Sequence, residues 1–142
     1  MNKLTYYTSM FILFSAACFL GLLFYWYLYP HEPIKFYGDM KILNENDTIK
    51  QGDLIILKVS FDKKTKITPI VHRKIVDGVI YDVGSVVSIK NDLGLGENIG
   101  GLEVPHSILE GIYHLEYTAC YQMNPIREVC VDYQSEEFQV IK

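Results

Sequence analysis

The feature that most constrains this chain is a long apolar run: between Lys3 and His31 there is no charged residue and no histidine. Its central part, Met10 to Leu28, reads MFILFSAACFLGLLFYWYL. An α-helix rises about 1.5 Å per residue, so this part would span roughly 28 Å, close to the hydrocarbon thickness of a bilayer. The run therefore predicts one transmembrane helix over residues 10–29, preceded by a short cytoplasmic tail at 1–9.

Aromatic residues flank the run at both ends, where rings with a polar edge favour the headgroup boundary of a bilayer. Pro30 and Pro33 end the helix, because proline has no N–H to continue it, and residues 30–34 then form a linker. We expect contacts with the lipid interface from Tyr6, Tyr7, Tyr25, Trp26, Tyr27 and Tyr29.

Three other interpretations of the run stay open. A cleaved signal peptide would use Ser15-Ala16-Ala17 as its cleavage site, but the apolar stretch 19–29 would then begin a soluble protein and promote aggregation. A lipoprotein would use Cys18, although Ser15 stands where a bacterial lipobox favours leucine. A buried globular helix conflicts with the length of the run and its apolarity on all sides. An uncleaved anchor fits the whole run best.

The charges around the run favour a cytoplasmic N-terminus, because Lys3 precedes it and basic residues tend to stay inside. The C-terminal domain would then be periplasmic or extracellular. Without Lys3, the 13 basic residues fall to 12 against 17 acidic ones, a net charge of −5 after the anchor. This acidity argues against nucleic acid as a partner, since nucleic-acid binding requires clustered Lys and Arg.

From Ile34 onward, short runs of alternating apolar residues are separated by turn residues, which is typical of half-buried strands. No helix is expected there. The segment 91–101, reading NDLGLGENIGG, lacks the spacing of a phosphate-binding loop and is expected to be a flexible loop. We expect strands at 34–43, 54–61, 68–76, 79–83, 86–89, 102–104, 112–123 and 127–140.

Two hairpins can be predicted from local signals. Asp77-Gly78 predicts a two-residue type I′ turn, which pairs Val76 with Val79, Ile75 with Ile80 and Arg73 with Asp82. A three-residue turn at 124–126 would close the second hairpin, with Met123 and Arg127 as its hydrogen-bonded pair. The apolar pairs on its buried face would be Tyr121 with Val129, Ala119 with Val131 and Tyr117 with Tyr133.

This second register places Cys120 opposite Cys130 on the polar face. Directly opposed cysteines on antiparallel strands can have the close separation that a disulfide requires, so we expect a disulfide between them. Two unpaired thiols in a reducing compartment are the alternative, and a metal site is a weaker one, since no histidines cluster nearby. A disulfide would imply an oxidising compartment and would agree with the proposed topology.

The segment from Pro105 to Tyr113, PHSILEGIY, resembles the corner before the penultimate strand of many immunoglobulin-like domains, where a Gly-x-Tyr opens that strand. The resemblance implies an all-β immunoglobulin-like sandwich of seven or eight antiparallel strands over residues 35–142. It departs from antibody domains, because the only tryptophan lies in the anchor and Cys120 and Cys130 share one hairpin. The stretch 111–127 also resembles small, uncharacterised membrane proteins of tailed bacteriophages, which implies no activity.

No motif predicts catalysis, and we expect no enzyme activity, cofactor or metal. The interpretation we favour is a membrane-anchored binding or structural module that presents its sandwich to a protein partner, a second copy or an envelope assembly. The alternative is a phage accessory protein that works through its helix, in lysis or in superinfection exclusion. The candidate partner-binding residues are Asn124, Pro125 and Arg127 in the last hairpin and Asn98 in the glycine-rich segment.

Overall fold

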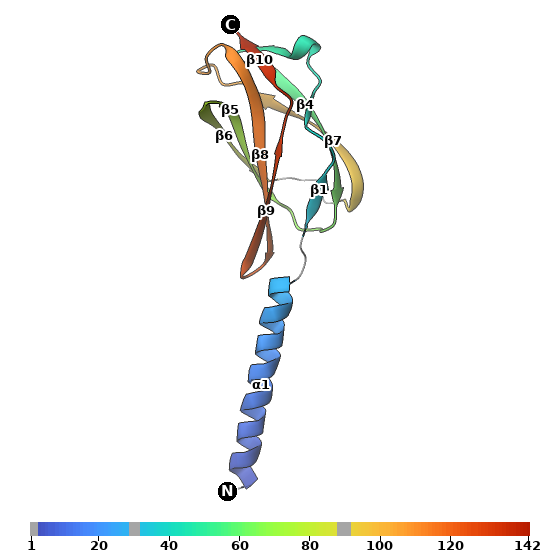
Figure 1. The fold of residues 1–142 in the computed structure, drawn as a ribbon, viewed down its shortest axis with the longest axis vertical. Coiled ribbons are helices and arrows are strands. Elements are labelled where there is room, and N and C mark those ends of the chain that lie inside the picture. Colours follow the sequence, from blue (N-terminus) through green and yellow to red (C-terminus); the bar gives the residue numbers. More distant parts are fainter. Residues whose placement is uncertain (1–2, 29–31, 88–91) are drawn as a thin grey trace.

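The computed structural model describes residues 3–28, 32–87 and 92–142. An apolar helix, α1 (Lys3–Leu28), stands below a unit of two β-sheets that face each other (Figure 1). The fold is therefore mostly β in a sandwich-like arrangement, preceded by one N-terminal helix. This agrees with the fold class expected from the sequence at that level of detail.

Helix α1 begins at Lys3, before the expected start at Met10. Its segment Thr5–Leu28 is long and apolar enough to cross a membrane, and it is not buried against the sandwich. The aromatic side chains expected at the lipid interface lie near its two ends. Tyr6, Tyr7, Tyr25 and Tyr27 are exposed and Trp26 is half-buried, whereas Tyr29 lies outside the described residues.

The first sheet is built around strand β4 (Leu54–Lys63). Strand β7 (Gly94–Glu103) pairs with β4 along its whole length. The short strands β1 (Ile34–Phe36) and β2 (Lys41–Ile42) follow one another along the other edge of β4. All of these pairings are antiparallel.

The second sheet is built around the long strand β8 (Gly111–Asn124). On one side β8 pairs with β5 and on the other with β9 and β10 in succession, and β6 lies beyond β5. Strand β3 pairs with β10 in parallel, so the sheets are not wholly antiparallel as expected. The bounds are β3 (Thr48–Lys50), β5 (Ile70–Asp77), β6 (Val79–Val87), β9 (Arg127–Gln134) and β10 (Phe138–Ile141), and a 3-10 turn covers Glu45–Asp47.

The core lies between the sheets and comes from the inward positions of each strand. Ile55 of β4, Ile75 of β5 and Leu115 of β8 are each 0% exposed. Burying such a side chain stabilises the fold by about 1.5–3 kcal/mol. The buried Ser135 hydroxyl accepts a 2.8 Å hydrogen bond from the Leu115 N–H and donates to the Glu136 carbonyl, so its polar atom is satisfied.

Several expected strand boundaries were wrong. Segment 34–43 is two strands separated around Gly38, whose φ of +70° is unfavourable for other residues. Segment 127–140 is likewise divided into β9 and β10, whereas 79–83 and 86–87 belong to one strand, β6, and residues 88–91 lie outside the described residues. Strand β3 was not expected.

The expected register of the first hairpin was wrong by one residue. Ile75 faces Tyr81, Lys74 faces Asp82, and the turn is reduced to Gly78, with Asp77 opposite Val79. The observed register pairs the buried Ile75 with Tyr81, which packs against the core. The expected register would have placed the exposed Ile80 there instead, so core packing outweighs the local turn preference.

The glycine-rich segment forms a regular strand, β7, over Gly94–Glu103 instead of the expected loop. Its partner β4 has strong strand character and supplies a complete antiparallel ladder. The glycines give room to side chains of β4: a Cβ at Gly101 would lie 2.9 Å from the Leu54 side chain, and one at Gly96 would lie 3.2 Å from the Phe61 ring. Pairing with β4 therefore orders a segment whose own composition favours a loop.

Three tyrosines at the centre of the second sheet should make the fold sensitive to alkali. Burial raises the pKa of Tyr117 and Tyr121 to about 12, and it also raises the pKa of Tyr133. An unfolded tyrosine has a pKa of about 10, so between pH 10 and 12 the unfolded state loses its protons first. The contribution of these buried tyrosines to the stability of the fold is therefore complete below about pH 10 and is lost as the pH rises toward 12. For the fully buried Tyr121, the loss is roughly 2–3 kcal/mol.

Tyrosinate absorbance and tryptic resistance, followed from pH 9 upward on the detergent-solubilised chain, would check this. We expect Tyr117, Tyr121 and Tyr133 to ionise only when the sandwich unfolds. Tyr121→Phe should reduce the slope of stability against pH, while Tyr37→Phe on the surface should not. Ionisation of Tyr117, Tyr121 and Tyr133 near pH 10 with the fold intact would contradict the prediction.

Candidate functional site

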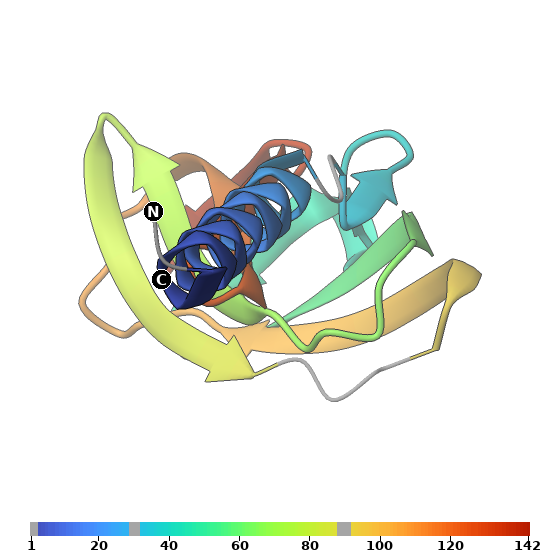
Figure 2. The same cartoon turned by 90° about the horizontal axis from the view of Figure 1, so that it is seen from below.

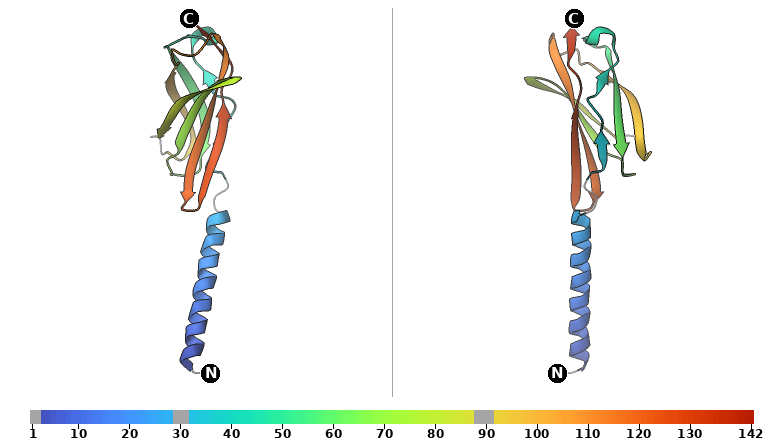
Figure 3. Two further views of the ribbon diagram at one scale, coloured as in Figure 1. Left: turned by 90° about the vertical axis from the view of Figure 1, so that its left-hand side faces the viewer. Right: turned by 45° about the vertical axis from the view of Figure 1, so that its right-hand side comes forward.

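The hairpin formed by β8 and β9 reaches down to the end of helix α1 (Figure 3). Its turn consists of Pro125 and Ile126, with Asn124 paired to Arg127 and an irregularity between Gln122 and Asn124. The expected three-residue turn closed by Met123 and Arg127 was therefore wrong. The irregularity takes up one residue and leaves the rest of the expected register unchanged.

Two side chains of this turn bind carbonyl groups in the last turn of α1. The Asn124 side-chain amide donates a 2.8 Å hydrogen bond to the carbonyl of Trp26, and the Arg127 guanidinium donates one to the carbonyl of Tyr27. The last carbonyls of a helix have no partner within the helix. The hairpin therefore supplies from outside a cap that the helix cannot supply itself.

Arg127 also complements the helix electrostatically. The C-terminal end of a helix carries a partial negative charge, and α1 has no basic residue in its last turn. The guanidinium at the Tyr27 carbonyl provides a positive charge at that end. Three of the four candidate partner-binding residues, Asn124, Pro125 and Arg127, thus lie at the junction between helix α1 and the sandwich. The sequence showed no signal for this junction, because the contacting residues are about a hundred positions apart.

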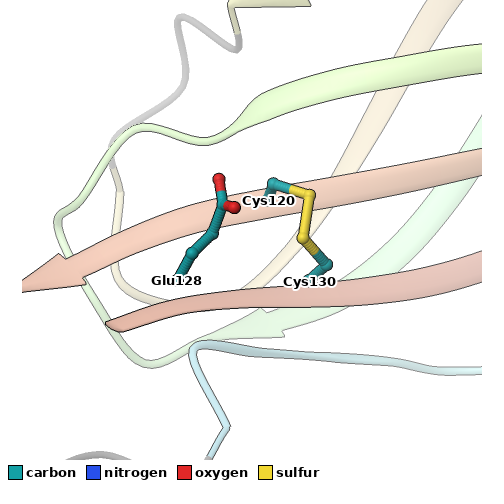
Figure 4. A group of neighbouring side chains, drawn as sticks. All are labelled: Cys120, Glu128 and Cys130. Carbon is teal, nitrogen blue, oxygen red and sulfur yellow. A yellow bond between two sulfur atoms is a disulfide. The ribbon is translucent and has the colours of Figure 1, made fainter. Parts of the chain in front are cut away.

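Farther along the same hairpin, Cys120 faces Cys130 and the two are joined by a disulfide (Figure 4). Their Cα atoms are 4.0 Å apart, and Cys130 is exposed. Tyr121 opposite Val129 and Tyr117 opposite Tyr133 agree with the expected register. The disulfide therefore links the two strands that reach the end of the helix.

The carboxylate of Glu128 lies beside the disulfide, and its oxygen and the two sulfur atoms are within 4.8 Å of one another (Figure 4). Metal binding by cysteine requires the thiolate. Because both sulfur atoms are used in the disulfide, this cluster offers one exposed carboxylate only. It is not a metal site in the oxidised form.

Asn98, the fourth candidate partner-binding residue, lies on strand β7 opposite Val59. Within the described residues, β7 pairs with β4 only, so its other edge is open over all ten residues. Seen from below, β6 and β7 lie at the periphery of the sandwich (Figure 2). An open edge presents a row of unpaired backbone N–H and C=O groups to which another strand can bind.

Two small spaces open between the sheets beside Asn98. One has a volume of about 60 Å³ and is lined by Phe61, Lys63 and Tyr121 among others. The other measures about 160 Å³ and is lined by Arg73 and Tyr117 among others. Sites for small organic ligands usually measure about 300–1,000 Å³. Neither space holds such a ligand without movement of the sheets.

Lys63 is the one charged residue that is buried within the described parts of the chain, at 3% exposure. Burial lowers the pKa of its amine, and the nearby Asp92 carboxylate offsets this in part. The backbone of Lys63 pairs with that of Ile34, directly after the linker. Lys63 lines the space of about 60 Å³ between the sheets.

Two histidines of the described residues, His72 and His114, each lie beside a polar side chain. Ser85 Oγ lies 2.7 Å from His72 Nδ1, and His114 Nε2 lies 3.3 Å from a carboxylate oxygen of Glu116. A nucleophile of the serine type needs a base that is oriented by a third group. Within the described ranges, no carboxylate is hydrogen-bonded to His72, so the Ser85 pair lacks that third group.

One hydrogen bond closes the corner before β8. The hydroxyl of Tyr113, a buried residue, donates to the carbonyl of Leu109 at 3.0 Å. Burial also raises the pKa of this hydroxyl. The bond spans four residues and fixes the entry of the chain into the central strand of the second sheet.

No protein-family model matches this sequence, and no curated protein matches it. Among solved structures, the chain is similar to an alkylpurine DNA glycosylase, AlkC, of Pseudomonas fluorescens bound to DNA with an abasic-site analog, at 9% identity and a TM-score of 0.45. That match covers 80% of this chain and 32% of the glycosylase, so the chain spans about a third of it. A Niemann-Pick type C2 protein from the Japanese carpenter ant matches at 14% identity and a TM-score of 0.45, over 80% of this chain and 96% of the ant protein. At these TM-scores neither likeness carries an argument about function.

Proposed function

We propose that this chain is a membrane-anchored binding or structural module that holds an immunoglobulin-like sandwich in a fixed position outside the cytoplasm. The observation that carries the proposal is the contact of Asn124 and Arg127 with the last-turn carbonyls of α1. It joins anchor and sandwich into one body. A domain that only had to be tethered would need no such contact.

The immunoglobulin-like assignment rests on two features. Two β-sheets face each other around one core, and the Tyr113 hydroxyl closes the corner before the long strand β8. A tyrosine at this corner, bonded to backbone a few residues upstream, is a hallmark of immunoglobulin-like sandwiches. The parallel pair of β3 and β10 is a local addition at one edge.

The placement outside the cytoplasm rests on the disulfide and on Lys3. Disulfides persist in oxidising compartments and are rare in the cytosol. The Cys120–Cys130 disulfide is on the sandwich, and Lys3 is at the other end of the anchor. Both favour a cytoplasmic N-terminus and a sandwich in the periplasm or outside the cell.

The open edge of β7 is the surface that we assign to a protein partner. A partner strand added there would gain backbone hydrogen bonds along the edge. The exposed side chains of Glu97, Asn98 and Ile99 would set its specificity. The fixed anchor would hold this edge at a constant height above the membrane.

Photocrosslinking in intact cells tests this assignment. A photoreactive amino acid at Ile99 should give one adduct of defined mass, and the same group at the exposed Ile112 of β8 should not. The Ile99 adduct should persist when α1 is replaced by an unrelated transmembrane helix. If no adduct forms along β7, the edge assignment fails. If function is lost on replacing the helix while the sandwich stays folded, a protein that works through its helix is favoured instead.

A further inference from the structure

The loop after β4 carries lysines close to the end of the anchor. Lys63 ends β4 and is followed by Lys64-Thr65-Lys66, and the backbone N–H of Lys64 donates to the carbonyl of Pro33 at 2.9 Å. The Lys64 amine also lies 3.7 Å from the Glu32 carboxylate. Helix α1 ends at Leu28, and an extended chain covers at most about 3.6 Å per residue, so Glu32 lies within about 14 Å of the helix end. These lysines are therefore held near the end of α1.

The tip of the β8–β9 hairpin lies at the same end. Asn124 and Arg127 contact the last turn of α1, and Ile126 between them is 58% exposed. An exposed isoleucine at this place points neither into the core nor into the described contacts with the helix. The hairpin tip is the part of the sandwich that reaches closest to the helix in two views (Figure 3).

The charge of this end differs from that of the domain as a whole. The part after the anchor has a net charge of −5, yet three of the four residues in 63–66 are lysines. Lys64 and Lys66 are exposed, and Lys63 is turned inward. The carboxylates near these residues are Glu32 beside Lys64, Asp92 near the Lys63 amine, and Asp62 and Glu128, which adjoin Lys63 and Arg127 in the sequence. Of these, Glu32 is already paired with Lys64.

We propose that Lys64, Lys66 and Ile126, which we call the membrane-facing rim, bind the leaflet above the anchor. The two amines would contact phosphate groups of anionic phospholipids, and Ile126 would insert at the boundary between headgroups and acyl chains. A basic residue near an anionic membrane surface contributes about 1 kcal/mol to the free energy of membrane binding, and an apolar side chain buried in the membrane adds to this. The inference rests on the proposed membrane anchoring. It adds a second membrane contact that fixes the tilt of the sandwich.

The lipid preference of the full chain tests the role of the lysines. The chain is placed in nanodiscs of phosphatidylcholine with phosphatidylglycerol, and spin-labelled forms of each lipid report which one lies next to the protein. We expect a preference of about fivefold for phosphatidylglycerol, which corresponds to about 1 kcal/mol. Lys64→Glu/Lys66→Glu should abolish the preference. Lys50→Glu/Lys142→Glu, with the same charge change at the end far from the helix, should retain it (Figure 1).

The depth of the hairpin tip tests the role of Ile126. A spin label at Ile126→Cys, in a Cys18→Ser background, should be shielded from a water-soluble nickel chelate and accessible to oxygen. The same label at Ile112→Cys should be fully accessible to nickel. Equal nickel accessibility at positions 126 and 112 would contradict the proposed membrane contact of the rim. Equal lipid preference in the two double variants would contradict it as well. A chain that is not retained in the bilayer at all would overturn the anchoring itself.

Discussion

The double substitution Asn124→Ala/Arg127→Ala is expected to release the sandwich from the end of helix α1 while both parts stay folded. A neutral hydrogen bond contributes about 1 kcal/mol, and one from a charged donor about 1.5–3 kcal/mol. Losing both bonds should cost about 3 kcal/mol, which lowers the docked population relative to the free one by about 100-fold. Both side chains are half-buried beside the turn and belong to neither core cluster, so the core is not disturbed.

Distances between two spin labels would measure this release. One label would replace Leu20 in the helix and the other would replace Val79 at the start of β6, in a Cys18→Ser background. The native contacts predict one narrow distance distribution, and the double variant should give a broad one. Glu128→Ala on the same hairpin serves as the control and should leave the distribution narrow. A narrow distribution in the double variant would show that the linker alone fixes the orientation.

Removing the Cys120–Cys130 disulfide is expected to destabilise the sandwich by about 3 kcal/mol. The two cysteines are ten positions apart, and closing a loop of that size lowers the entropy of the unfolded chain by a corresponding amount. A small domain is stable by only about 5–15 kcal/mol in total, so this is a large fraction. Denaturant unfolding of Cys120→Ala/Cys130→Ala in detergent would measure the loss.

The third cysteine provides a matched control. Cys18 is a free thiol exposed on helix α1, far from the sandwich, so Cys18→Ala should leave the unfolding of the sandwich unchanged. Dithiothreitol should destabilise the native chain as much as the double substitution does and should not affect the double variant. A thiol-reactive polymer that labels Cys120 and Cys130 in unreduced cells would contradict both the disulfide and the oxidising compartment.

The features that could be predicted are those encoded by neighbouring residues. The helix follows from a run without charge, and the pairing of Cys120 with Cys130 follows from alternation along two strands and the turn between them. The predicted register of this hairpin was confirmed although the predicted turn was wrong. The irregularity near Asn124 lies between the turn and the first regular pair, Gln122 with Glu128, and it compensates for the difference. Strand β4 was also evident from its alternation.

The features that could not be predicted depend on partners distant in sequence. Strand β7 has no alternation of its own and is ordered by β4, about forty positions earlier. The register of Ile75 with Tyr81 is decided by the core and not by the turn. Asn124 and Arg127 looked like free loop residues because nothing local shows that the helix end lies beneath them. The sequence therefore placed three candidate residues on the hairpin, but their contact with the helix required the three-dimensional structure.

Strand β8 has a mechanical consequence. It runs without interruption from Gly111, at the corner far from the helix, to Asn124 at the helix end, a length of roughly 46 Å. Its ladders with β5 and β9 are antiparallel, so their hydrogen bonds lie across the strand. A pull on α1 would enter the sandwich through β1, and at the β8–β9 hairpin it would load the hydrogen bonds of Asn124 and Arg127 before these ladders. Tension on the helix would therefore separate the hairpin turn from the helix end before it opened the second sheet.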